Sequence, residues 1–147
     1  MEKYGVLFLC IGNSCRSQMA EAIVNAAPEG RWAAFSAGTE PAGYVHPMAI
    51  RALAEMGIAH QGVSKSVAQF RDQKFDLVIT VCEEAAENCP VWLGSGKKLH
   101  FSFPDPAIVK GTEQEKMAAF RQVRDGLQTK IIAALEQYQT ALASVDY

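Results

Sequence analysis

The chain has 147 residues, the usual length of one domain and enough to bury one substantial hydrophobic core, so a single domain over residues 1–147 is expected. Hydrophobic residues make up 49% of it and charged residues 20%, which excludes a disordered or fibrous chain. The formal net charge is −2, and the longest run of positive charge is the pair Lys97 and Lys98. Nucleic acid is therefore not an expected partner.

The apolar stretch at residues 4–11 is about a third of the length of a membrane span. It lacks a basic flank and a small-residue cleavage site, so we interpret it as a strand and expect no export and no membrane association. The expected protein is a monomer in the reducing cytoplasm. There, its four cysteines are more often catalytic, redox-active or metal-binding than structural disulfides.

Short apolar runs alternate with helical patterns along the chain. The apolar runs predict four buried strands, at residues 4–9, 32–35, 77–81 and 99–103. The helical patterns predict helices at residues 17–27, 47–57, 83–89 and 112–142. This alternation is typical of an α/β fold with three layers, in which a parallel sheet has helices on both faces. Ligands bind beyond the carboxyl ends of such strands.

The first predicted strand leads into a loop with the pattern Cys, five residues, Arg, followed by a helix. Such a loop can direct successive backbone N–H groups at one centre, and the helix N-terminus adds positive potential, so we expect it to bind a tetrahedral oxyanion. Gly12 permits an unusual backbone angle and Asn13 tolerates one. The expected oxyanion-binding residues are Ile11, Gly12, Asn13, Ser14, Cys15, Arg16 and Ser17.

Cys10 and Arg16 are the reactive side chains of this loop. The positive field would favour the thiolate form of Cys10, which makes it the candidate nucleophile, and Arg16 would offer a planar two-pronged donor to the anion. The alternative is that Cys10 is a small buried residue at a strand end, since Cys-x5-Arg alone is a weak pattern.

Asp105 follows the fourth predicted strand and lies between Pro104 and Pro106. Attack on an oxyanion needs a proton for the departing oxygen, and Asp105 is a candidate donor. The alternative is that Asp105 only caps a turn, which is the usual role of Asp in a proline-rich loop.

The cysteine spacing argues against a zinc site. Cys10-x4-Cys15 is at the edge of the close spacing that zinc pairs have, and Cys82-x6-Cys89 lies outside it, so no bound metal is expected. All four cysteines could instead be core residues, and for Cys15 that interpretation stays open. Three isolated histidines form no ligand pattern and are expected to be ordinary surface or core residues: His46, His60 and His100.

The run CIGNSCRSQMAEA, from Cys10 to Ala22, resembles the signature of arsenate reductases related to low-molecular-weight tyrosine phosphatases. The resemblance implies a four-stranded parallel sheet in the order 2-1-3-4, with Asp105 as the general acid and no bound cofactor. It implies reduction of arsenate to arsenite, for detoxification. The resemblance extends along the chain through Ser36-Ala37-Gly38, Cys82, Cys89-Pro90, Asp105-Pro106 and Gly111-Thr112-Glu113.

In this family, the cysteines that match Cys10, Cys82 and Cys89 form a disulfide relay. Cys10 would attack arsenic and form a thiol-arsenate adduct. Cys82 would then attack Cys10 and release arsenite, and Cys89 would attack Cys82 and free Cys10. The resemblance thus makes thioredoxin the expected electron donor, acting on the Cys82–Cys89 disulfide.

Two other functions compete with this one. A low-molecular-weight phosphotyrosine phosphatase is the alternative enzyme, but phosphatases of this fold typically have aromatic residues after the Asp-Pro, where this chain has Ala107 and Ile108. Weak phosphatase activity would still be expected, because the anion loop is shared. A non-catalytic oxyanion-binding regulatory module would leave Cys10, Arg16 and Asp105 unexplained.

Some family members bind a potassium ion beside the anion loop, through residues matching Asn13, Glu21 and Ser36 and an acid at the position of Lys65. The lysine here leads us to expect that its ammonium takes the place of the cation, pairs with Glu21 and supports the loop. An exposed lysine without a role is the alternative.

The relay also predicts a change of shape between Cys82 and Cys89. Residues seven apart on a helix are separated by about 10.5 Å along its axis. A disulfide needs α-carbons roughly 4.4 to 6.8 Å apart. The predicted helix at residues 83–89 would therefore have to loop out when the disulfide forms.

Overall fold

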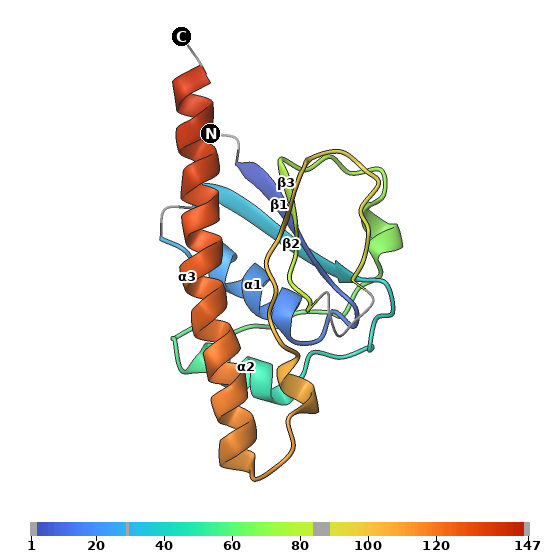
Figure 1. The fold of residues 1–147 in the computed structure, drawn as a ribbon, viewed down its shortest axis with the longest axis vertical. Helices are drawn as coiled ribbons and strands as arrows, with labels where there is room; N and C mark the ends of the chain where they lie inside the picture. The colour runs from blue at the N-terminus through green and yellow to red at the C-terminus, as the bar shows by residue number, and fades with distance from the viewer. Residues whose placement is uncertain (1–2, 29, 84–88, 146–147) are drawn as a thin grey trace.

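The computed structural model describes residues 3–28, 30–83 and 89–145 (Figure 1). The elements follow one another as strands alternating with helices, in agreement with the α/β prediction. In chain order they are β1 (Tyr4–Cys10), α1 (Arg16–Asn25), β2 (Trp32–Gly38), α2 (Pro47–Ala54), the 3-10 helix η1 (Val67–Phe70), β3 (Leu77–Thr80), β4 (Lys97–His100), the 3-10 helix η2 (Pro106–Ile108) and α3 (Glu113–Val145).

The four strands form one parallel sheet in the order β2-β1-β3-β4, as the resemblance implied. β1 is central, and its last residue, Cys10, is in register with Gly38 at the end of β2. Leu9 is in register with Thr80 of β3, which in turn pairs with His100 of β4. The carboxyl ends of all four strands therefore meet at one edge, where the loops that follow them can share a site.

β1 directs alternate side chains to opposite faces of the sheet. Val6 and Phe8 pack with α1, α2 and α3, whereas Leu7 and Leu9 pack with the opposite cluster, which includes Trp92. All four strand residues are fully buried, and each contributes about 1.5–3 kcal/mol relative to an exposed position. Three α-helices thus cover one face, and the 3-10 helix η1 with its neighbouring aromatic residues covers the other.

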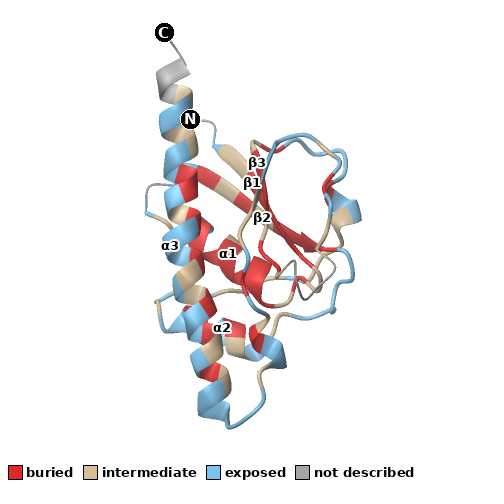
Figure 2. Ribbon diagram, in the orientation of Figure 1, coloured by how far each residue is buried: buried red, intermediate tan, exposed pale blue. Residues whose placement is uncertain are grey.

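α3 begins at the predicted capping box. Thr112 Oγ1 accepts from the backbone N–H of Glu115 at 3.1 Å, and Glu115 Oε1 accepts from that of Thr112 at 3.2 Å. The helix lies along α1 and α2 and buries the side turned towards them (Figure 2). Its buried apolar residues recur at helical spacing, as predicted: Met117, Phe120, Val123, Leu127, Ile131 and Leu135. Among the described residues, no helix is both long and apolar enough to span a membrane.

The fourth strand differs from the prediction in position and burial. The sequence predicts a buried strand at residues 99–103, but the fourth strand is the edge strand Lys97–His100, with Lys97 and Lys98 exposed. Phe103 is buried outside the sheet, among residues that pack with α3, and Lys130 Nζ lies 5.4 Å from its ring centroid. An apolar run predicts burial but cannot distinguish burial in a strand from burial by a loop. The helix predicted at 83–89 concerns residues 84–88, which lie outside the described part of the chain.

Candidate active site

The predicted oxyanion loop lies between β1 and α1, at the carboxyl edge of the sheet. Its carbonyl groups bond outward to the segment that follows β2. Because the C=O and N–H groups of one trans peptide point in opposite directions, the N–H groups of Gly12, Asn13 and Cys15 face away from that segment, as in an anion-binding nest. The outward bonds run from Glu40 N to Ile11 O at 2.9 Å, Ala42 N to Gly12 O at 2.9 Å and His46 N to Ser14 O at 3.0 Å.

Asn13 is the residue whose backbone turns the loop. Its φ of 48° lies in the left-handed region, which asparagine tolerates better than most residues. Its side-chain Oδ1 accepts from the backbone N–H of Lys65 at 2.8 Å and from Gln18 Nε2 at 3.0 Å. Of the two loop residues that the sequence marks as able to adopt an unusual angle, Asn13 has the positive φ and Gly12 does not.

Gly38, at the end of β2, is the glycine that the loop requires. A Cβ atom at this position would lie 2.3 Å from Ile11 O and 2.9 Å from Asn13 N. Both are backbone atoms, so neither can move without shifting the anion loop. Sequence analysis noted Gly38 only through the resemblance, because a close approach between two distant segments leaves no local signal.

Cys10 Sγ lies 2.8 Å from Ser17 Oγ. Asn13 Nδ2 donates to the same Ser17 oxygen at 2.8 Å, so the hydroxyl hydrogen of Ser17 is available to Cys10. Cys10 is 2% exposed. The candidate nucleophile therefore faces a hydrogen-bond donor within a buried loop.

Arg16 joins the anion loop to the loop after β4. It donates through one terminal nitrogen to Phe103 O at 3.0 Å, and its other terminal nitrogen lies 3.9 Å from Asp105 Oδ2. Asp105 Oδ1 meanwhile accepts from the backbone N–H of Ala107 at 2.9 Å and caps η2. Asp105 thus caps the turn with Oδ1 and faces Arg16 with Oδ2.

Lys65 and Glu21 lie beside the loop. Lys65 Nζ is 3.6 Å from Glu21 Oε1 and donates to Val63 O at 2.8 Å. Ser36 Oγ donates to the same Glu21 oxygen at 3.1 Å. The Lys65 side chain is 19% exposed, so it is not the freely solvated lysine of the alternative interpretation.

Cys82 and Cys89 form a disulfide, with their α-carbons 5.9 Å apart. Cys82 is fully buried in the core cluster that also contains Cys10, whereas Cys89 is half-buried at its edge. Cys10 and Cys15 are free thiols. Burial first, and then the charges of Asp105 and Cys10, raise the pKa of Cys15 to about 12.

The sequence pattern of low molecular weight phosphotyrosine protein phosphatases matches residues 5–144, nearly the whole chain. The chain belongs to this family. Within the low molecular weight phosphatase family, it is similar to a protein named arsenate reductase from Halalkalibacterium halodurans, with 43% identity over 132 residues that cover 89% of this chain and 94% of the relative.

Solved structures of the family agree with the fold. The crystal structure of an arsenate reductase from Archaeoglobus fulgidus is 35% identical, covers 83% of this chain and 98% of its own, and has a TM-score of 0.64. A structure described as an arsenate reductase in the oxidized state is 28% identical, covers 91% of this chain and 98% of its own, and has a TM-score of 0.71.

Two polar residues of this family member escaped sequence analysis. Gln18 is fully buried on α1, and His60, expected to be an ordinary residue, lies with its Nε2 2.8 Å from Gln18 Oε1. A polar residue on the buried side of α1 is a signal that could have identified Gln18, but nothing in the sequence connects it to His60. Within the described residues, no three His, Cys, Asp or Glu side chains lie close enough to hold a metal ion.

Proposed function

We propose that this chain reduces arsenate to arsenite, with Cys10 as nucleophile and electrons taken from thiols. The observation that carries the proposal is the Cys82–Cys89 disulfide, which begins in the same buried cluster as the free Cys10. A phosphatase needs one thiol, whereas a reductase must collect two electrons. The identity to a curated arsenate reductase supports the same conclusion.

The first step is attack on bound arsenate. The backbone N–H groups of residues 11–17 and the guanidinium of Arg16 hold the oxyanion. Cys10 Sγ bonds to arsenic, one arsenic–oxygen bond breaks, and Asp105 donates a proton so that the oxygen leaves as water. Arg16 Nη1 already donates to Phe103 O at 3.0 Å, and the other N–H groups of the guanidinium can serve the anion.

The second and third steps are thiol exchanges. Cys82 attacks Cys10 Sγ, the sulfur–arsenic bond breaks, and its electron pair remains on arsenic, which leaves as arsenite. Cys89 then attacks Cys82, and the thiolate of Cys10 is released. The disulfide of this structure, with Cys10 free, corresponds to the product of that third step.

A dithiol reductase of the thioredoxin type would regenerate the enzyme in a reducing cytoplasm. Cys82 is fully buried and Cys89 is half-buried, so the reductant would attack Cys89. Val91 and Leu93, which are 81% and 91% exposed, lie next to it along the chain and offer apolar contact. Trp92 between them is buried, so the exposed apolar surface here comes from Val91 and Leu93.

Support of the anion loop completes the proposal. We propose that the Lys65 ammonium acts as a built-in cation and pairs with the carboxylate of Glu21. The backbone N–H of Lys65 donates to Asn13 Oδ1. Ser36 holds the same carboxylate from β2. The arrangement ties the loop to β2 and to the segment around residue 65.

The test is arsenate-dependent oxidation of NADPH in the presence of thioredoxin and thioredoxin reductase. We expect steady oxidation with arsenate and none when phosphate replaces it. Release of arsenite should match the NADPH consumed, one for one. No oxidation with arsenate, combined with fast hydrolysis of p-nitrophenyl phosphate, would overturn the proposal in favour of a phosphatase.

A further inference from the structure

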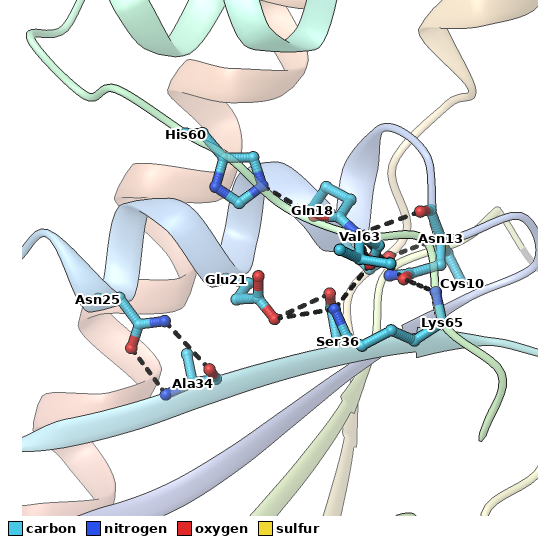
Figure 3. Close-up of polar contacts among 11 residues, drawn as sticks. Cys10, Asn13, Gln18, Glu21, Asn25, Ala34, Ser36, His60, Val63 and Lys65 are labelled. Atoms are coloured by element: carbon cyan, nitrogen blue, oxygen red, sulfur yellow. Dashed lines mark hydrogen bonds and ion pairs between the residues drawn. The ribbon is translucent and has the colours of Figure 1, made fainter. Parts of the chain in front are cut away.

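A chain of hydrogen bonds runs from His60 to the sulfur of Cys10, through three side chains of the loop and α1. Figure 3 shows its beginning, where His60 meets Gln18. Its four contacts are 2.8 to 3.0 Å long. In order they are His60 Nε2 to Gln18 Oε1 at 2.8 Å, Gln18 Nε2 to Asn13 Oδ1 at 3.0 Å, Asn13 Nδ2 to Ser17 Oγ at 2.8 Å and Ser17 Oγ to Cys10 Sγ at 2.8 Å.

The donors of this chain all point the same way. Gln18 Nε2 faces three oxygens, of which Val63 O at 2.9 Å is the nearest, so its Oε1 is the atom that accepts from His60. The imidazole must therefore carry its hydrogen on Nε2. Asn13 likewise donates to Ser17, which leaves the Ser17 hydrogen for the sulfur. Each group accepts on the side of His60 and donates towards Cys10.

Burial makes this alignment important. Gln18, Asn13 and Ser17 are all 0% exposed, so an amide or hydroxyl left without a partner among them would be strongly unfavourable. In such a medium, aligned hydrogen bonds polarise and strengthen one another. The donor end at His60 thus contributes to the field that the Cys10 sulfur experiences.

Gly62 provides a second, independent observation for the His60 contact. A Cβ atom at Gly62 would lie 2.3 Å from Gln18 Oε1 and 2.3 Å from His60 Nε2. Any other residue there would push the two side chains apart. The segment between α2 and η1 is therefore built to allow the imidazole to reach Gln18.

We propose that His60 is a positioning residue for Cys10: its Nε2–H fixes the amide of Gln18, and through Asn13 and Ser17 it orients a donor at the nucleophilic sulfur. Burial lowers the pKa of His60, an effect that Lys65 strengthens and Glu21 opposes, so the ring is neutral at neutral pH and has one N–H to give. The inference rests on the proposed function only for the role of Cys10.

The test compares two substitutions of His60 in a background with Cys15→Ala, Cys82→Ser and Cys89→Ser, so that Cys10 is the sole thiol. His60→Leu removes the donor, whereas His60→Gln retains an N–H at a similar position. We expect His60→Leu to slow alkylation of Cys10 by iodoacetamide at neutral pH by roughly five- to tenfold. The far-ultraviolet absorbance of the Cys10 thiolate should fall in parallel in His60→Leu. His60→Gln should restore most of the alkylation rate and most of the absorbance.

Asn25→Ala is the control, and it lies on α1, the helix that carries Gln18. It removes a partly buried polar contact, the Asn25 amide that bonds Ala34 N at 2.9 Å and Ala34 O at 3.1 Å, which lies outside the chain to Cys10. It should lower the melting temperature and leave the alkylation rate unchanged.

Equal alkylation rates for His60→Leu and the parent would overturn the proposal, as would a failure of His60→Gln to restore the rate. Nitrogen NMR of the parent should show the His60 hydrogen on Nε2, and a hydrogen on Nδ1 instead would also overturn it. None of these measurements uses arsenate, so they remain decisive even where arsenate reduction fails.

Discussion

The loop after β1 and the segment after β3 both carry cysteine chemistry, but the structure holds them in opposite ways. The polar side chains of the first are buried and bonded to one another: Asn13, Ser17 and Gln18 are fully buried, and the loop is bonded to residues 40–46, 65 and 103. The second starts at a buried Cys82, but its described far side presents Val91 and Leu93 almost fully to solvent.

The difference corresponds to two chemical tasks. Binding an oxyanion and directing a sulfur at its centre require fixed donors, since donors placed beforehand need no rearrangement in the transition state. A disulfide relay requires one sulfur to change partners and then to meet a reductant from outside. We therefore expect substitutions in the loop to affect the first chemical step, substitution of Cys82 to block the release of arsenite, and substitution of Cys89 to affect recycling alone.

Cys10→Ser should have the largest effect. A serine hydroxyl is scarcely ionised at neutral pH, so the variant should not form the adduct with arsenic. Arsenite release should therefore stay at the background rate. The variant should still fold, because oxygen fits where sulfur did. Measurable multiple turnover in Cys10→Ser would show that the loop does not supply the nucleophile.

Cys89→Ala should separate the two regions. The loop is intact in this variant, so it should release one arsenite per chain and then stop, with Cys10 joined to Cys82. Rapid-quench measurement of arsenite and peptide mass spectrometry would check both points. Sustained turnover driven by thioredoxin would mean that Cys89 is dispensable and that the relay is wrong.

Gly38→Ala tests how closely the end of β2 packs against the anion loop. The new Cβ would lie 2.3 Å from Ile11 O, so the loop backbone must shift. We expect a loss of about 1–3 kcal/mol in the free energy of unfolding, and a fall of roughly tenfold or more in the single-turnover rate.

Gly12→Ala is the contrasting substitution. Its Cβ would meet only Ala42 Cβ, at 3.9 Å, and its φ is not in the left-handed region. The free energy of unfolding should change by less than about 0.5 kcal/mol. Equal destabilisation by the two alanines would show that close approach at Gly38 is not what holds the loop.

These two glycines show where sequence reasoning reaches its limit. The order of elements, the parallel sheet and the capping box at Thr112 could all be predicted, because periodicity and capping are local properties. The clash that Gly38 avoids lies between segments some 25 residues apart in the sequence, so no window along the chain contains it. The fourth strand was misplaced because its apolar run buries Phe103 outside the sheet.

The same distinction applies to the site. Cys10, Arg16 and Asp105 could be named from residue types and spacing, and the structure brings their loops together. His60 could not, because its part depends on reaching Gln18, 42 positions earlier, and on the missing side chain at Gly62. Long-range contacts between single polar atoms have no sequence periodicity.

Substitution of Lys65 should have a smaller effect. It tests whether the charge of this side chain supports the anion loop. Lys65→Met should raise the KM for arsenate about threefold, because Glu21 loses a partner 3.6 Å away in a partly buried position. Replacing sodium by potassium at constant ionic strength should leave the parent rate unchanged and stimulate Lys65→Asp. Strong stimulation of the parent by potassium would contradict the assignment of Lys65 as a built-in cation.

Cys15 should show the smallest effect, which is a lack of reaction with iodoacetamide. This lack of reaction tests whether the loop is as closed as the structure indicates. Iodoacetamide reacts with thiolates, and the pKa of about 12 means that roughly one Cys15 in ten thousand is ionised at pH 8. In the protein with the Cys82–Cys89 disulfide, peptide mass spectrometry should therefore find Cys10 alkylated and Cys15 unmodified. After unfolding in guanidinium chloride, the two should react at similar rates, which controls for the reagent. If Cys15 in the folded protein reacted within tenfold of the rate of Cys10, the anion loop would have to open on the timescale of labelling. The contrast between a closed anion loop and the solvent-exposed side chains of Val91 and Leu93 would then no longer hold.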